Sequence, residues 1–152
     1  MKTYLNDAQA TRDLGRQIAG LAYPGLVLAL QGELGAGKTT LAQGVGDGLN
    51  VQDRVRSPTF IILSLYEKGR LPMVHADLYR LGDASELVEL GLDEFLSMGV
   101  TLIEWSERFP EILPKDHLVV VLADQEQGRL ADIRGTGTKA QDFVRSLQAL
   151  RG

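Results

Sequence analysis

The chain contains no cysteine and no long apolar run among its 152 residues. The lack of cysteine excludes disulfides, thiolate metal sites and a cysteine nucleophile, and it is typical of proteins from a reducing compartment. No apolar segment approaches the roughly 20 residues that a transmembrane helix needs. Residues 1–10 also lack the basic and then apolar pattern of a signal peptide. We therefore expect a cytoplasmic protein that does not contact a membrane.

The chain also has no excess of basic over acidic residues. The chain has 16 lysine and arginine residues against 20 aspartate and glutamate residues, which gives a formal net charge of -4. Proteins that bind nucleic acid unaided usually present a basic face. Any nucleic acid in this protein's function is therefore expected to be held mainly by a partner.

Apolar segments of strand length alternate with segments of helical character along the chain. We predict strands at 26–30, 60–65, 73–76, 100–103, 117–123 and 129–133, helices at 7–19, 38–49 and 139–150, and one or two helices within 83–98. The last two strands are expected to pair as a hairpin. This alternation predicts an α/β fold around a largely parallel sheet flanked by helices. Because no repeat or linker interrupts it, residues 1–152 are expected to form a single domain.

Residues 31–40, Gln-Gly-Glu-Leu-Gly-Ala-Gly-Lys-Thr-Thr, match the G-x-x-x-x-G-K-[ST] pattern of a P-loop. The pattern follows a predicted buried strand and opens a predicted helix, which is the context a P-loop requires. Glycines let backbone N–H groups approach phosphate oxygens closely, and the helix N-terminus favours an anion. Lys38 is expected to reach the β- and γ-phosphates, and Thr39 to bind Mg²⁺. The sequence thus predicts a three-layer, P-loop NTPase-like domain.

The identity of the base is indicated by a missing motif. P-loop GTPases normally carry an Asn-Lys-x-Asp clamp for guanine. The nearest stretches, residues 114–117 and 138–142, do not supply it. ATP is therefore the expected nucleotide.

A P-loop site also needs a carboxylate at the end of a neighbouring strand, and two residues compete for that place. Glu104 ends an apolar run without a breaker, whereas Asp77 ends a segment weakened by Pro72 and by the polar His75. We therefore expect Glu104 beside the metal. For Asp77 the alternative is the N-cap of a helix at 78–81, a role that is compatible with that of a second carboxylate of the site.

Three further features lie close to these motifs. Ser57, Pro58, Thr59 and Phe60 fall between the P-loop helix and the next strand, where a switch segment often senses the γ-phosphate; a structural turn is the alternative. Trp105, the sole tryptophan, directly follows the proposed metal carboxylate and is expected in the core or as a lid over the site. His75 has no other ligand nearby, so a metal role is not expected for it.

Taken in order, the stretches GELGAGKTT, SPTF, HADLYRL and IEW resemble the bacterial TsaE family, formerly called YjeE. The resemblance covers essentially the whole chain. It implies a small Mg²⁺-dependent P-loop ATPase that acts in making N6-threonylcarbamoyladenosine at position 37 of tRNAs that read ANN codons. It also implies a TsaB–TsaD partner complex, through which the protein meets tRNA indirectly. ATP hydrolysis, slow in the protein alone, would support repeated turnover of that complex.

The resemblance implies roles for single residues as well. Thr11 would lie beside the nucleotide, toward the base, and Trp105 would be a functional neighbour of the site. Residues expected to bind ATP through its phosphates are Gly35, Ala36, Gly37, Lys38, Thr39 and Thr40. Mg²⁺ would be bound by Thr39 and Glu104, and the catalytic set would be Lys38, Asp77 and Glu104. The C-terminal basic residues Arg129 and Arg134 carry no assignment.

Two functions of other classes stay open at this point. A small-molecule kinase shares the compact P-loop core, but it usually needs an arginine-bearing lid, and the arginines here are scattered along the chain. A nucleotide-gated binding module would switch partner affinity by ATP occupancy alone. The sequence retains Lys38, Thr39, Asp77 and Glu104, a set that predicts hydrolysis and disfavours that second alternative.

Overall fold

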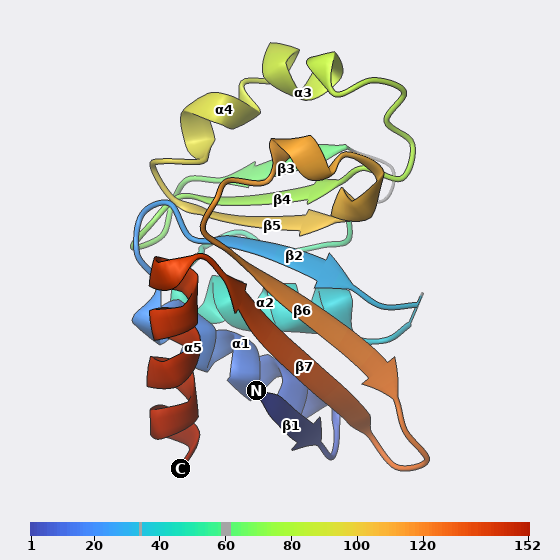
Figure 1. Cartoon of the computed structure of the whole chain (residues 1–152), viewed down its shortest axis with the longest axis vertical. Helices are drawn as coiled ribbons and strands as arrows, with labels where there is room; N and C mark the ends of the chain where they lie inside the picture. Colours follow the sequence, from blue (N-terminus) through green and yellow to red (C-terminus); the bar gives the residue numbers. More distant parts are fainter. Residues whose placement is uncertain (34, 59–61) are drawn as a thin grey trace.

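The computed structural model describes residues 1–33, 35–58 and 62–152, and within these ranges seven strands form one sheet (Figure 1). The strands are β1 (Lys2–Leu5), β2 (Val27–Gln31), β3 (Leu63–Tyr66), β4 (Met73–Asp77), β5 (Val100–Glu104), β6 (His117–Asp124) and β7 (Arg129–Thr136). The α-helices are α1 (Ala8–Leu21), α2 (Lys38–Gly48), α3 (Ser85–Glu89), α4 (Leu92–Phe95) and α5 (Thr138–Arg151). Short 3₁₀ turns occupy Ser106–Arg108 and Pro110–Ile112.

The strands follow the order β1-β7-β6-β2-β5-β4-β3 across the sheet. The four central strands, β6, β2, β5 and β4, are parallel, as predicted. Both edges are antiparallel, because β3 pairs with β4 on one side and β7 pairs with β6 and β1 on the other. The predicted hairpin of the last two strands is confirmed, whereas β1 was not predicted. The fold is thus α/β with a mainly parallel centre.

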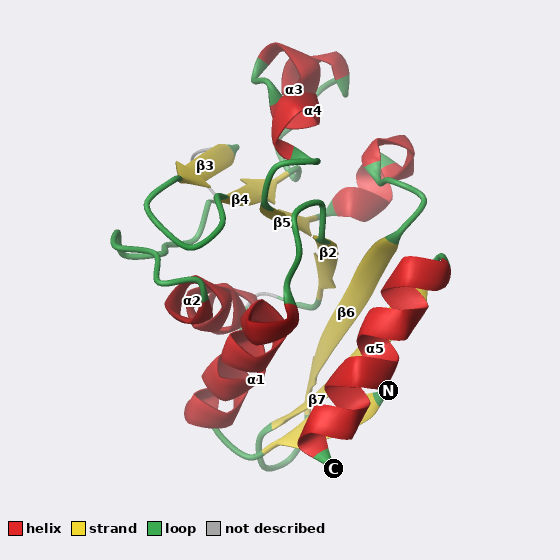
Figure 2. Ribbon diagram, turned by 90° about the vertical axis from the view of Figure 1, so that its left-hand side faces the viewer, coloured by secondary structure: helices red, strands yellow, loops and turns green. Residues whose placement is uncertain are grey.

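Helices cover both faces of this sheet (Figures 1 and 2). Alternate side chains of each central strand point to opposite faces, so each face builds a core of its own. On one face Leu28 and Leu30 of β2 pack with buried residues of α1, α2 and α5. On the other face Val27 packs with Ile103 and with buried residues of the segment that carries α3 and α4. The result is the predicted three-layer arrangement.

Close contact between α1 and α2 positions the P-loop helix. The Asp7 side chain caps α1 by accepting a hydrogen bond from the Ala10 backbone N at 2.8 Å. Gly15 lies on the buried face of α1, where a Cβ would come within 2.7 Å of the Val45 backbone N in α2. Gly44 of α2 meets the α1 backbone at Arg12 in the same way. Side chains at these two glycines would separate the helices and displace α2.

Two local predictions differ from the structure. The strand predicted at 60–65 is observed as β3 (Leu63–Tyr66), and residues 60 and 61 fall outside the described ranges. The one or two helices predicted within 83–98 are observed as two, α3 and α4. The helix considered at 78–81 is wrong, because a turn occupies this stretch. In the part of the chain that is described, no helix has both the length and the apolar character needed to cross a membrane.

Candidate nucleotide site

A cavity of about 520 Å³ lies where the parallel strands β4 and β5 end and α2 begins. Ligands of open α/β sheets bind in this place, beyond the carboxyl ends of the strands. The volume falls within the range of small-molecule sites. The residues that line it are Gly35, Gly37, Lys38, Thr39, Thr40, Ser57, Asp77, Tyr79, Glu104, Trp105 and Arg129. The fold thus brings the predicted P-loop, both predicted carboxylates and Trp105 to one cavity.

The glycine-rich loop has the backbone geometry that phosphate binding needs. Gly35 and Gly37 have φ angles of +84° and +104°, in the left-handed region that favours glycine. Gly37 is also the N-cap of α2, and no side chain of the described residues caps this end of the helix. The N–H groups of the first helical turn therefore have no partner within their own helix and suit an anion in the cavity.

Two residues predicted at the nucleotide lie behind the loop instead of lining the cavity. Thr11 is fully buried, and its hydroxyl donates a weak hydrogen bond to the Asp7 backbone O at 3.4 Å. Its methyl group lies beneath Gly37, since a Cβ on that glycine would be 3.6 Å from Thr11 Cγ2. Ala36 is buried in the main core. In this structure both residues support the loop from below, and direct nucleotide contact stays a prediction for them.

The predicted switch segment is described only in part. Ser57 lines the cavity, and Pro58 is buried beside it. Thr59 and Phe60 lie outside the described residues. The structure therefore brings the first hydroxyl of the segment to the site, and its switch role stays a prediction.

Glu104 is the charged centre of the site. It ends β5, is 5% exposed, and contacts a basic side chain through each carboxylate oxygen. Lys38 Nζ lies 3.3 Å from Oε1, and His75 Nε2 lies 2.7 Å from Oε2. Burial opposes ionisation of Glu104, but the hydrogen bond from His75 and the charge of Lys38 outweigh it. The pKa of Glu104 is therefore lowered, and the side chain is a carboxylate at neutral pH.

Asp77 lies directly beside Glu104 in the parallel register of β4 and β5. Its Oδ1 accepts a hydrogen bond from the Tyr79 backbone N at 2.9 Å, so it caps a turn and not a helix. Burial and the neighbouring charge of Glu104 raise the pKa of Asp77, although the Tyr79 hydrogen bond and Lys38 oppose the change. The two carboxyls thus differ in character, since the environment favours the charge on Glu104 and disfavours it on Asp77.

Trp105 forms the mouth of the cavity together with Tyr79. Their ring centroids lie 5.0 Å apart, and Lys38 Nζ lies 5.7 Å from the centroid of the Trp105 ring. Trp105 is 36% exposed and has a left-handed φ of +63°, which turns the chain sharply after β5. The tryptophan is therefore a wall of the cavity, and the alternative of a core residue is wrong.

Arg129, Tyr79 and His75 also lie in or beside the site, although the sequence predicted no role there for them. Arg129 begins β7, lines the cavity and donates from its guanidinium to the Gly35 backbone O at 2.9 Å. Its Nε also lies 3.5 Å from the Asp124 carboxylate, across the β6–β7 hairpin. No local pattern distinguishes this arginine from the others, since its place depends on the hairpin register.

The geometry of this cavity agrees with the comparisons with known proteins. A family model described as "Threonylcarbamoyl adenosine biosynthesis protein TsaE" matches residues 5–131. The chain belongs to the TsaE family.

Relatives in the TsaE family match most of the chain. A Bacillus subtilis protein named "tRNA threonylcarbamoyladenosine biosynthesis protein TsaE" is 44% identical over 115 residues, which are 75% of this chain and 72% of the relative. A Nostoc protein of the same name is 38% identical over 149 residues, covering 94% and 91% of the two chains. The crystal structure of Bacillus subtilis YdiB matches with a TM-score of 0.86 at 31% identity, over 100% of this chain and 96% of that one.

The donor set in this TsaE-family chain fits a Mg²⁺ ion that is bound together with a nucleotide. Among the described residues, no three histidine, cysteine, aspartate or glutamate side chains gather as a metal cage. Magnesium is usually bound through one or two carboxylates together with substrate phosphates and water. Thr39 and Glu104 line the same cavity as the phosphate-binding loop. These residues therefore fit a magnesium ion that arrives with a nucleotide.

Proposed function

We propose that this protein is a Mg²⁺-dependent ATPase that serves tRNA threonylcarbamoyladenosine biosynthesis. The observation that carries the proposal is the contact of Lys38 with Glu104 at the opening of α2. A largely buried lysine and a buried carboxylate lie beside a glycine loop with left-handed backbone, and this combination suits a triphosphate and its metal. ATP is preferred to GTP, because the chain lacks the Asn-Lys-x-Asp guanine clamp.

Each residue of the site has a role in this proposal. The backbone of residues 35–40 holds the phosphates, and Lys38 neutralises the charge of the β- and γ-phosphates. Thr39 and Glu104 would hold Mg²⁺, and the chemistry that the ion would supply there is neutralisation of charge on the phosphate oxygens. Asp77 positions the attacking water; its raised pKa makes it a better proton acceptor than an exposed aspartate once it is ionised.

We further propose that the protein acts with a TsaB–TsaD complex on adenosine 37 of tRNAs that read ANN codons. Relatives that cover most of the chain carry the name of this biosynthesis. With a net charge of -4, the chain has little electrostatic attraction for tRNA, so the partner complex holds the tRNA. ATP hydrolysis then supports turnover of the complex, and the whole process takes place in the cytoplasm.

The decisive experiment measures ATP hydrolysis by the purified protein with Mg²⁺, first alone and then with the TsaB–TsaD pair. We expect slow hydrolysis alone and marked stimulation by the pair. Acceptor-dependent ADP release without a partner would overturn the proposal in favour of a small-molecule kinase. ATP-dependent binding to the pair without hydrolysis, before and after tRNA is added, would instead identify a nucleotide-gated binding module.

A further inference from the structure

His75 is buried beneath the candidate site and has no role in the proposed mechanism. It lies on β4 two residues before Asp77, with 0% exposure, and pairs in register with Leu102 of β5. Since Glu104 follows Leu102 by two residues, the imidazole lies on the core side of the Glu104 carboxylate. His75 is not among the described residues that line the cavity, so it can affect the cavity only through a neighbouring residue, Glu104.

The two oxygens of Glu104 face different environments because of this histidine. Oε2 points to the core and lies 2.7 Å from His75 Nε2. Oε1 lies 3.3 Å from Lys38 Nζ at the cavity. A carboxylate held at one oxygen cannot turn freely about its terminal bond, so the second oxygen keeps a constant direction.

The chemistry of the acceptor assigns the proton on the ring. An ionised carboxylate only accepts hydrogen bonds, so Nε2 of His75 must carry the proton that joins it to Glu104. Nδ1 is buried and has no hydrogen-bond partner among the described residues. Within the described structure, the hydrogen bond to Glu104 is therefore the one polar contact of this ring. That bond offsets the desolvation cost of burying the imidazole.

We propose that His75 is a positioning residue for Glu104. Its Nε2–H holds Oε2, so that Oε1 is presented to Lys38 in the free protein and to Mg²⁺ when nucleotide is bound. The inference rests on the proposed function, because it assumes that Glu104 binds the metal. Hydrogen bonds to metal-binding carboxylates typically change metal affinity by about 10- to 100-fold when they are lost.

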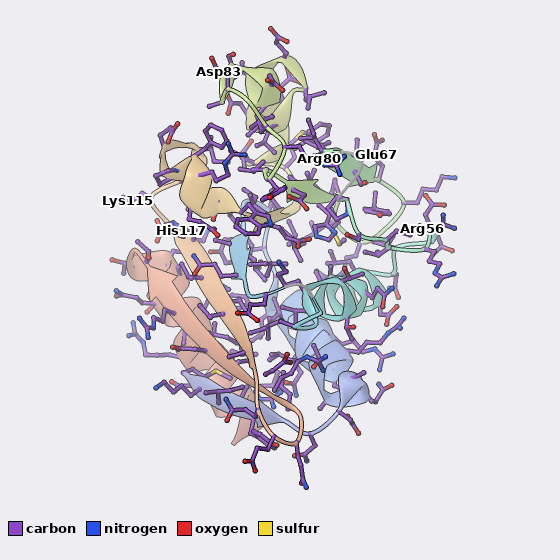
Figure 3. All side chains as sticks on the ribbon, turned by 90° about the vertical axis from the view of Figure 1, so that its right-hand side faces the viewer. Arg56, Glu67, Arg80, Asp83, Lys115 and His117 are labelled. Atoms are coloured by element: carbon purple, nitrogen blue, oxygen red, sulfur yellow. The ribbon has the colours of Figure 1, made fainter. Side chains whose placement is uncertain are left out.

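The first test uses calorimetry to measure how tightly Mg²⁺ binds to the protein–ADP complex in three variants. His75→Leu removes the donor, His75→Gln keeps an N–H donor on a flexible chain, and His117→Gln is the control. His117 is half-buried at the start of β6, where its Nδ1 lies 2.8 Å from the Pro114 backbone O (Figure 3). We expect about 10- to 100-fold weaker Mg²⁺ binding in His75→Leu, partial recovery in His75→Gln and no change in the control.

Nucleotide binding in EDTA separates this inference from the function on which it rests. We expect His75→Leu to bind ADP without metal as the parent protein does, because the phosphate-binding loop is untouched. Parent-like Mg²⁺ affinity in His75→Leu would overturn the positioning role alone. If the parent protein bound no nucleotide, the proposed function would be overturned, and the role of His75 in metal binding, which depends on that function, would be overturned too.

A second measurement needs no variant and therefore does not depend on how His75→Leu folds. The chain has two histidines, and ¹⁵N imidazole spectra of the free protein report which ring nitrogen carries the proton. We expect the proton on Nε2 in His75 and on Nδ1 in His117, whose partner is a backbone carbonyl. A His75 ring protonated on Nδ1 alone would overturn the proposal.

Discussion

Lys38 Nζ lies 3.3 Å from Glu104 Oε1, so the cation proposed for phosphate is paired with the carboxylate proposed for Mg²⁺. Both side chains are largely buried, and a buried charge without a partner is costly. In the proposed function, joint binding of nucleotide and metal would let Lys38 exchange Glu104 for phosphate and Glu104 exchange Lys38 for Mg²⁺. Each group would then have a partner of opposite charge in both states, so the charged site would also be stable before nucleotide arrives.

Replacement of Lys38 tests this exchange. We expect Lys38→Ala to lower kcat by about 10²–10³-fold, the usual effect of losing one preorganised donor to transition-state charge. tRNA modification in the reconstituted system should be lost, while the fold is kept. Lys115→Ala is the control, since this lysine is exposed near the start of β6 (Figure 3). Full modification activity in Lys38→Ala would contradict the phosphate-binding role.

Variants of Glu104 and of Asp77 are expected to differ in the Mg²⁺ concentration that turnover requires. Glu104→Gln should bind nucleotide but require more Mg²⁺ for turnover, because the amide is a poorer metal ligand. Asp77→Asn should lower turnover without changing the Mg²⁺ requirement. Steady-state hydrolysis measured over a range of Mg²⁺ concentrations distinguishes them. The reverse pattern would mean that Asp77 binds the metal and that the two roles have to be exchanged.

Asp77 also predicts how stability of the metal-free protein depends on pH. Its pKa is raised in the folded state by burial and by Glu104, so ionisation destabilises the fold as pH rises through that pKa. Asp77→Asn cannot ionise and keeps an oxygen that accepts from Tyr79. At neutral pH we expect Asp77→Asn to have a higher Tm than the parent, by about 2–4 °C for each kcal/mol gained in the free energy of unfolding. At acid pH, where Asp77 is protonated, we expect no difference in Tm.

The control for this experiment is Asp83→Asn. Asp83 accepts a hydrogen bond from the Ser85 backbone N at 2.9 Å, two residues ahead, as Asp77 does from Tyr79. It is exposed at the outer end of the molecule (Figure 3). Its replacement should not give a pH-dependent gain in Tm. A gain at acid pH in Asp77→Asn would contradict the assigned direction of the pKa change.

Trp105 is a built-in reporter of nucleotide binding. It is the sole tryptophan, stands at the mouth of the cavity and lies close to Lys38. Nucleotide bound as proposed would draw Lys38 away from the ring and alter the solvent contact of the ring, so we expect tryptophan emission to shift upon saturation with ATP and Mg²⁺. Calorimetry under the same conditions establishes saturation. Unchanged emission at saturation would mean that nucleotide does not reach this wall of the cavity.

Arg129 is expected to stabilise the nucleotide-binding form of the loop. Arg129→Ala removes a hydrogen bond from a charged donor to Gly35, a class worth roughly 1.5–3 kcal/mol. Nucleotide affinity should fall on the order of tenfold or more. Arg134→Ala is the matched control, because Arg134 is exposed on the same strand and is likewise paired with an aspartate, Asp132. Equal affinities of the two variants would leave Arg129 without a role in the site.

Local patterns in the sequence predicted the parts of the fold that repeat at short range. The apolar run before the glycines, the helix after them and the hairpin at 117–136 are visible because side-chain periodicity and turn residues are local properties. Glu104 and Asp77 could be placed at one edge of the sheet, since both end apolar segments. The strand β1 and the antiparallel pairing of β3 with β4 were not predicted, because an edge strand is defined by the partner it finds and not by its own pattern.

By itself, the sequence determined that a glycine loop, a lysine and two carboxylates meet at the carboxyl ends of parallel strands. Tertiary structure alone decided which other side chains reach them. Arg129 contacts Gly35 across 94 positions of sequence, and His75 contacts Glu104 across 29. Thr11 is carried beneath the loop by the close packing of α1 on α2. These contacts depend on strand register and helix spacing. Because packing of the whole core sets both, no local sequence pattern predicts the contacts.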